Sequence, residues 1–301
     1  MFKKTFICAL TLLSTFIFAA DKAKVILIAG QDSHKPGDHE FLAGCTLLKN
    51  KLDTAMGDKL ETILVERNWP ADESIFEGAD AIVIYSDGQG KHPIKDKQDF
   101  IGKLMDKGVG LAMMHYACDV PKGEQGENFK KWLGGHYETR WSTNPHWTCD
   151  SILHKTHPIS KSVKDFSVKD EWYFNMRWAD QPFHTDILQG IPDKESRQGK
   201  TSHPRGPYSH IVANEGRKET LLWAVERKDG GRGFGFTGGH FHANWANDEY
   251  RKLVLNAIVW LAKVEVPEGG IPSSTPTEKE LNHLTKQDRG AVKSKKKNKQ
   301  K

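Results

Sequence analysis

Short polar segments rich in histidine and carboxylate follow apolar runs at several points of the chain. His34 lies in the loop GQDSHKPGDHE, His115 ends the run GVGLAMMH, Glu171 stands in DEWYFN, and His240 in GGHFHANW. Imidazole exchanges protons near neutral pH, and a carboxylate among aromatic side chains can have a raised pKa and act as an acid. We therefore predict His34, His115, Glu171 and His240 as catalytic residues.

The segment GGHFHANW also has the spacing of a metal site. If it is strand-like, His240 and His242 face the same side, and the glycines let the backbone approach a ligand closely. Neutral imidazole is a common ligand of zinc and other divalent ions. The sequence predicts a divalent ion, with zinc as one candidate, bound by His115, His240 and His242, and it predicts no nucleotide cofactor.

Other side chains in these loops suit a carbohydrate, because aromatic rings stack on apolar sugar faces and guanidinium groups meet hydroxyls. The predicted substrate-binding residues are His39, Glu40, Asp87, Tyr116, His136, Tyr137, Arg140, Trp172, Asn244 and Trp245. Structural roles stay open beside these. Asp38 can cap the following helix with His39 packed there, and His115 can be a buried histidine bound by backbone.

The cysteines do not form a disulfide framework, because only Cys45, Cys118 and Cys149 remain once the N-terminal segment is set aside. Cys118 follows His115 by three residues. A nucleophilic cysteine is expected on the sharp turn itself, with a base beside it. We therefore expect Cys118 to start the next helix, buried and inert.

The elements that position these residues alternate between strand and helix. Apolar runs predict strands at 23–30, 59–67, 79–88, 109–115 and 232–245, and a hairpin of 209–215 with 220–227. Helical spacing predicts helices at 41–56, 93–108 and 248–263. The order indicates an α/β fold with a doubly wound, mainly parallel sheet, in which ligands bind beyond the carboxyl ends of the strands. His34, Asp87, His115 and Tyr116 should therefore share one rim.

Both ends of the chain differ from the body in composition. Residues 1–20 have two lysines, an apolar stretch and small residues, as in a cleaved secretory signal, and predict a secreted, periplasmic protein with no membrane segment after cleavage. Residues 268–301 read as a polar linker and basic disordered tail, with one short helix around EKELNHLTKQ, which leaves 21–267 as the domain. Removing the two signal lysines and the six of the run 293–301 from the net charge of +5 leaves −3, which argues against nucleic acid. Exposed tryptophans are compatible with a homodimer.

The order and spacing of the motifs SHxxGxHE, GGHY, DE-W/Y and GGH-x-H, over roughly residues 23–264, resemble the ThuA-like (trehalose-utilisation) family. The resemblance implies the class I glutamine amidotransferase-like fold, a flavodoxin-like three-layer sandwich with a mainly parallel central sheet. In amidotransferases the sharp turn after the strand holds a cysteine nucleophile. This sequence places His115 there, a departure that argues against glutaminase chemistry.

The resemblance links the chain to carbohydrate use, in the context of 3-keto sugars. We expect a lyase or hydrolase of a 3-keto-glycoside, with His115 or His34 as base and Glu171 as acid. His240 would bind a metal or the enolate oxygen. A second hypothesis is a non-catalytic periplasmic sugar-binding protein that uses the same rim. A third is a Cys118-dependent hydrolase of amidotransferase type.

Overall fold

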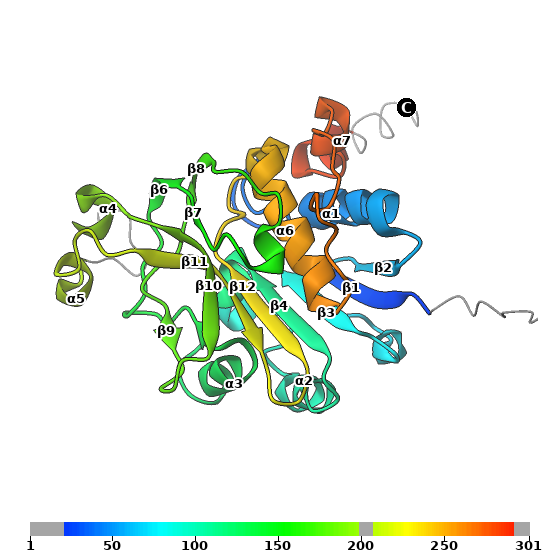
Figure 1. Cartoon of the computed structure of the whole chain (residues 1–301), viewed down its shortest axis with the longest axis horizontal. Helices are drawn as coiled ribbons and strands as arrows, with labels where there is room; N and C mark the ends of the chain where they lie inside the picture. The colour runs from blue at the N-terminus through cyan, green and yellow to red at the C-terminus, as the bar shows by residue number, and fades with distance from the viewer. Residues whose placement is uncertain (1–20, 199–206, 292–301) are drawn as a thin grey trace, which may run out of the picture.

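A mixed sheet of eight strands forms the centre of the computed structural model, which describes residues 21–198 and 207–291 (Figure 1). The strand order is β2-β1-β3-β4-β12-β11-β10-β7, in which β2 to β12 run parallel and the remaining pairs are antiparallel. In that order the strands are Leu60–Val65, Ala23–Ala29, Ala81–Tyr85, Gly110–Met114, Arg232–Phe236, Glu219–Glu226, His184–Gly190 and Ile152–Leu153. The predicted signal segment, 1–20, lies outside the described residues.

Helices cover both faces of the sheet, as the alternation within its strands requires. In β1, Val25 and Leu27 pack in the same apolar cluster as α1 (Phe41–Met56) and α6 (Asp248–Leu261). Ile26 and Ile28 point the other way, into the cluster that contains α2 (Gln98–Met105) and α3 (Glu124–Leu133). The predicted flavodoxin-like three-layer sandwich with a mainly parallel sheet is confirmed (Figure 1).

Smaller elements surround the carboxyl edge of the sheet. Two short antiparallel pairs join β5 (Gly135–His136) to β9 (Arg177–Trp178), and β6 (His146–Asp150) to β8 (Ser167–Glu171). The remaining helices are α4 (Lys194–Gln198), α5 (Ser209–Val212) and α7 (Glu278–Asn282). Five 3-10 helices lie in the described residues: Glu73–Phe76, Gln89–Lys91, His115–Cys118, Pro158–Ser160 and His242–Ala246.

Three sequence predictions about elements are wrong in part. Residues 209–215 do not form a strand but begin with helix α5, and β11 instead pairs with β12. A tight turn between them makes this possible, because Gly230 adopts φ +80° and Asp229 accepts a hydrogen bond from the Gly231 amide. The predicted helix 93–108 is shorter, Gln98–Met105, and the predicted strand 232–245 ends at Phe236.

The segment 268–291, predicted as linker and tail, packs against the domain over the residues that the structure describes. Ile271 is completely buried, and α7 begins with a capping box between Thr277 and Glu280. This part of the predicted tail is therefore folded structure. None of the helices within the described ranges has the length and apolar character to cross a membrane.

Candidate metal centre

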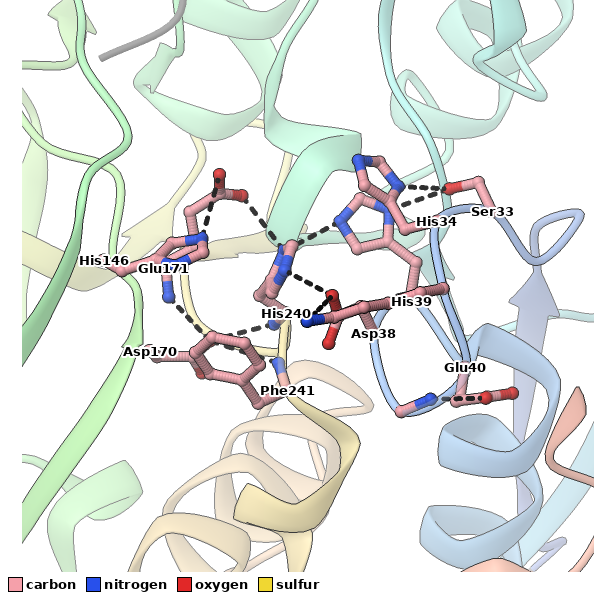
Figure 2. A network of polar contacts seen from close by, with 12 residues as sticks. Ser33, His34, Asp38, His39, Glu40, His146, Asp170, Glu171, His240 and Phe241 are labelled. Atoms are coloured by element: carbon pink, nitrogen blue, oxygen red, sulfur yellow. Dashed lines mark hydrogen bonds and ion pairs between the residues drawn. The ribbon is translucent and has the colours of Figure 1, made fainter. Parts of the chain in front are cut away.

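Four neighbouring strands of the sheet end at one place, and each delivers a polar side chain there. The loop after β1 carries His39, the end of β3 leads to Asp87, β4 leads to His115, and the turn after β12 carries His240. Glu171 comes from outside the sheet, at the end of β8. Figure 2 shows His39, His240 and Glu171 converging from these separate elements.

His115 occupies the sharp turn after β4 with φ +55°, a left-handed conformation that costs a non-glycine residue stability. The 3-10 helix His115–Cys118 starts at once, so the imidazole is aimed back over the sheet edge. The predicted placement of a histidine, rather than a cysteine, on this turn is therefore what the structure has. The strained backbone at His115 thus accompanies an imidazole that is held in one orientation.

The ligand atoms of His39, His115, Glu171 and His240 all lie within 4.8 Å of one another. His39 Nε2 is 3.0 Å from both His115 Nε2 and His240 Nδ1. Glu171 Oε2 is 3.2 Å from His240 Nδ1 and 3.6 Å from His115 Nε2. Neighbouring ligands of a four-coordinate zinc ion with bonds of about 2.0–2.1 Å lie roughly 3.3 Å apart, so the spacing suits such an ion.

The outer nitrogen of each imidazole faces an acceptor, and hydrogen bonds assign the tautomers of His115 and His39. His115 Nδ1 donates to the Thr237 carbonyl at 3.0 Å, and His39 Nδ1 donates to the Asp87 carboxylate at 3.0 Å. His240 Nε2 lies 3.4 Å from an Asp38 carboxylate oxygen (Figure 2). The Nε2 atoms of His115 and His39 are therefore left with lone pairs that point into the cluster, the arrangement in which proteins hold metal-bound histidines.

Burial and neighbouring charges shift the pKa values of these groups. Burial lowers the pKa of His115 well below its usual value, so this ring is neutral. Burial acts to raise the pKa of Glu171, but the contacts with His146, His240 and His115 outweigh it and lower the pKa. Burial likewise opposes protonation of His240, yet the Glu171 carboxylate raises its pKa. Lone pairs 3.0 Å apart repel, so the cluster favours one positive charge between them.

The residues fit a divalent transition ion, because imidazole and carboxylate in four-coordinate sets are zinc ligands. A second set of ligand atoms joins His34, His39 and Asp87. Ser33 Oγ donates to Asp87 at 2.8 Å and lies 2.9 Å from a ring nitrogen of both His34 and His39. Through these contacts Asp87 and Ser33 hold the His39 ring in its orientation, and together we call them the orienting layer.

Replacing Asp87 by asparagine tests this orienting layer. Asparagine keeps the shape but removes the negative charge that accepts the His39 Nδ1 proton. We expect zinc binding about 10–100-fold weaker, the usual cost of losing an outer partner of a metal ligand. Competition with a fluorescent chelator measures the Kd, and Asp99→Asn in α2 is the control. Equal Kd values for wild type and Asp87→Asn would show that Asp87 does not orient the ligand.

The structure brings the four residues predicted to be catalytic to one place, but their contacts suit roles other than those predicted. His115 and His240 belong to the cluster that could hold a metal ion. His34 lies at its exposed edge, with its ring centroid 3.8 Å from that of His39. His39, predicted to bind substrate, stands at the centre of the cluster. Glu171 is predicted to donate a proton, but its lowered pKa favours the carboxylate form, which suits a metal ligand better than a proton donor.

His242 does not join the cluster, contrary to the expectation from the H-x-H spacing. The chain leaves strand geometry after Phe236 and begins a 3-10 helix at His242, so strand alternation does not apply. His242 Nε2 instead donates to the Leu281 carbonyl at 2.6 Å. Its imidazole secures the C-terminal segment.

Several predicted substrate residues have structural positions. Trp172 and Trp245 are completely buried in the core around Tyr250, so neither side chain is open to a sugar. Glu40 accepts hydrogen bonds from the amides of Gly37 and Lys286. The remaining placements are Asn244 donating to the Lys169 carbonyl, His136 bonded to the Tyr137 carbonyl, and Arg140 in an exposed turn.

Two tyrosines predicted to bind substrate lie closer to the cluster. Tyr116 is half-buried, with its ring centroid 6.1 Å from that of His39. Tyr137 packs at 5.1 Å from Tyr173, whose hydroxyl lies 3.5 Å from His115 Nε2. Tyr116 therefore belongs to the rim and Tyr137 to the layer beneath it.

Cys118 is buried, as expected, but it ends the 3-10 helix His115–Cys118 and does not start the next helix, which begins at Glu124. Its Sγ lies 3.4 Å from the Met113 carbonyl. Burial raises the pKa of the thiol, which opposes formation of the thiolate nucleophile. These contacts turn the sulfur toward the strand beneath the turn. They argue against the Cys118-dependent hydrolase.

Sequence reasoning missed His146 and Tyr173. His146 Nε2 lies 3.6 Å from Glu171 Oε1, and its side chain is 43% exposed, which places it at the mouth of the cluster (Figure 2). It comes from β6, which pairs with β8 opposite Glu171. The segment PHWTCD has alternating burial but no glycine turn, the signal that accompanies His34 and His240.

Comparisons agree with the fold and the motifs. The trehalose utilisation family model, ThuA, matches residues 48–261. A ThuA-like protein of Bacteroides uniformis is similar with a TM-score of 0.56 and 17% identity, covering 82% of this chain and 95% of that one. A ThuA-like protein of Parabacteroides merdae gives 0.55 and 17%, covering 86% and 94%.

More distant structures are similar too, among them a glutamine amidotransferase of Thermotoga maritima with a TM-score of 0.45 and 8% identity, covering 81% of this chain and 100% of that one. No curated protein matches the chain. The resemblance predicted from the motifs is confirmed by the family match, which spans well over half of the sequence. The chain belongs to the ThuA trehalose utilisation family.

Proposed function

We propose that the chain is a metal-dependent enzyme that cleaves a 3-keto-glycoside or a related oxidised sugar. The observation that supports the reaction centre is the convergence of three imidazole lone pairs and one carboxylate, with the outer imidazole nitrogens facing acceptors. The sugar class follows from membership of the trehalose utilisation family and is part of the proposal. A bound divalent ion would act as a Lewis acid on a carbonyl oxygen.

The chemistry of a 3-keto-glycoside suits this cluster. The ketone acidifies the neighbouring C2–H bond, so a base can remove that proton and leave the electron pair as an enolate. The pair then forms the C1–C2 double bond while the C1–oxygen bond breaks, and the departing oxygen takes a proton. Addition of water across that double bond completes a hydrolysis. The reaction needs a neutral base, an acid and stabilisation of the enolate.

Two exposed histidines flank the cluster and suit the proton transfers. Burial and the neighbouring His39 and His240 lower the pKa of His34, which keeps this ring neutral and able to accept the C2 proton. Ser33 Oγ holds His34 at Nδ1, which leaves Nε2 for the substrate. On the other flank His146, held by Glu171, is placed to protonate the departing oxygen. His39, His115, His240 and Glu171 hold the ion.

Metal removal tests the proposal. The purified protein is stripped with a chelator and assayed on a 3-keto-glucoside with a nitrophenyl leaving group, beside the unoxidised glucoside. We expect release from the keto substrate alone and a loss of kcat/KM by about 1,000-fold on stripping, because a Lewis acid contributes several kcal/mol. Added zinc should restore the rate. His34→Ala should keep the metal and lose about 100–10,000-fold in kcat, as for a lost general base.

Each contrary result has a distinct meaning. Unchanged turnover after complete stripping would contradict metal dependence, and equal cleavage of both glucosides would contradict enolate chemistry. Saturable binding of the keto sugar without product would instead support a sugar-binding protein.

We also propose that the protein is exported, on the basis of the composition of residues 1–20. N-terminal sequencing of the protein from the periplasm should begin near Asp21, and recovery of intact protein in the cytoplasm would contradict it.

A further inference from the structure

The loop 31–40, which supplies His34, Asp38 and His39, has a conformation that it cannot maintain by itself. His34 and His39 adopt φ +62° and +46°, both left-handed and both unfavourable for residues with a Cβ. Such a loop needs hydrogen bonds from neighbouring segments to stabilise its strained conformation. On one side the turn after β12 supplies them, since the His39 amide donates to the His240 carbonyl at 3.0 Å and the His242 amide to Gly37 at 2.9 Å.

On the other side the C-terminal segment holds the loop through Lys286. Its ammonium group lies 2.5–3.4 Å from the backbone carbonyls of Ser33, His34, Lys35 and Asp38. Its side chain is only 20% exposed. The Lys286 amide also donates to Glu40 Oε2 at 2.8 Å, and Glu40 Oε1 accepts from the Gly37 amide at 2.9 Å. One residue therefore bonds both ends of the strained turn.

Two further contacts hold the segment in place. Arg289 pairs with Asp32, whose other oxygen accepts the Leu42 amide at the start of α1. The Leu281 carbonyl accepts the ring proton of His242 at 2.6 Å, directly after the metal-site turn. Helix α7 lies beside α1 at the edge of the molecule (Figure 1). The C-terminal segment itself, with Leu281, Lys286 and Arg289, lies beyond the range 48–261 that the family model matches.

We propose that residues 277–289 are a positioning element of the metal centre, with Lys286 as the residue that fixes the loop 31–40 and hence His39. Its effect on metal affinity rests on the proposed function. Its effect on the loop does not, because the carbonyl contacts are independent of any ion. Lys286 touches neither metal ligand nor substrate and acts through the backbone that bears His39.

The test compares wild type with Lys286→Met, which keeps the length of the side chain but removes the donor. Arg289→Gln is a second variant, and Lys279→Met, on exposed α7, is the matched control. Hydrogen exchange is measured on the metal-free proteins, zinc Kd by chelator competition, and global unfolding in urea. We expect exchange of the amides 31–40 to rise about tenfold or more in Lys286→Met, since bonds to a charged group are lost. The zinc Kd should weaken about 10–100-fold.

Global unfolding and exchange in α6 should stay near wild type in Lys286→Met, and Lys279→Met should match wild type throughout. Arg289→Gln should loosen the same loop to a smaller extent. Unchanged exchange of 31–40 in Lys286→Met would overturn the proposal, as would a loosened loop with an unchanged zinc Kd. A wild type that binds no divalent ion would contradict the proposed function, and the exchange data would then still decide whether Lys286 holds the loop.

Discussion

Replacing His39 by alanine is expected to weaken zinc binding by about 100–1,000-fold, because a binding free energy of about 10–16 kcal/mol is shared among four ligands. The Nε2 atom of His39 faces both His115 Nε2 and His240 Nδ1, at 3.0 Å each. Turnover on any substrate that needs the ion should fall with it. The change also leaves a cavity at a buried position, so the metal-free protein should lose some stability, as the matched control should.

The matched control is His136→Ala. His136 is as buried as His39, at 2% against 1% exposure, but its Nδ1 bonds the Tyr137 carbonyl in β5. This variant should lose some stability through its cavity and keep the zinc Kd within about threefold of wild type. Equal losses of zinc in both variants would indicate a general disturbance, and an unchanged Kd in His39→Ala would exclude His39 as a ligand.

Replacing Asp170 by alanine should have the largest effect on stability. Asp170 is completely buried, and its carboxylate accepts five hydrogen bonds. Four come from backbone amides and one from the Tyr250 hydroxyl. The amides are those of Glu171, Gly239, His240 and Phe241. Each buried donor left without a partner costs about 1–3 kcal/mol, so we expect the free energy of unfolding to fall by about 4 kcal/mol or more.

Urea unfolding measures this loss, and Asp150→Ala, on an exposed position of β6, should change it by less than about 0.5 kcal/mol. Asp170→Asn should not restore stability, because its amide group would place a donor against donors. The same change should weaken zinc binding, since the Asp170 bonds fix the backbone of His240 (Figure 2). A stable Asp170→Ala protein would contradict the proposed role of this carboxylate.

Periodicity predicted most of the fold because its strands are buried on both faces. The runs that became β1, β3 and β4 contain five or more consecutive buried residues, and 41–56 was predicted with the bounds of α1. The rule that ligands gather at the carboxyl edge of such a sheet then brought His34, Asp87 and His115 together correctly. The strand predicted at 209–215 was wrong, because the apolar pair in SHIV lies in a helical turn and not in an edge strand.

The site could be predicted only where a strand leads directly into it. His115 and His240 follow β4 and β12, whereas His146 enters from β6 and is positioned by pairing with β8. His39 and His34 are five residues apart in one polar loop, and only the backbone path, with its left-handed turns, decides which ring is buried. The tail resembled a disordered segment because few of its residues are apolar. Its described part, residues 268–291, is held by bonds from Lys286 and Arg289 to the loop 31–40.

The most direct test of the metal centre is X-ray absorption spectroscopy of the zinc-loaded protein, at one ion per chain. We predict a shell of nitrogen and oxygen ligands at about 2.0–2.2 Å, with the outer scattering of three imidazoles. The same spectrum of His240→Ala should lose one imidazole or show no bound zinc. A sulfur ligand at about 2.3 Å, or a wild type that retains no stoichiometric ion, would contradict the assignment of His39, His115, Glu171 and His240.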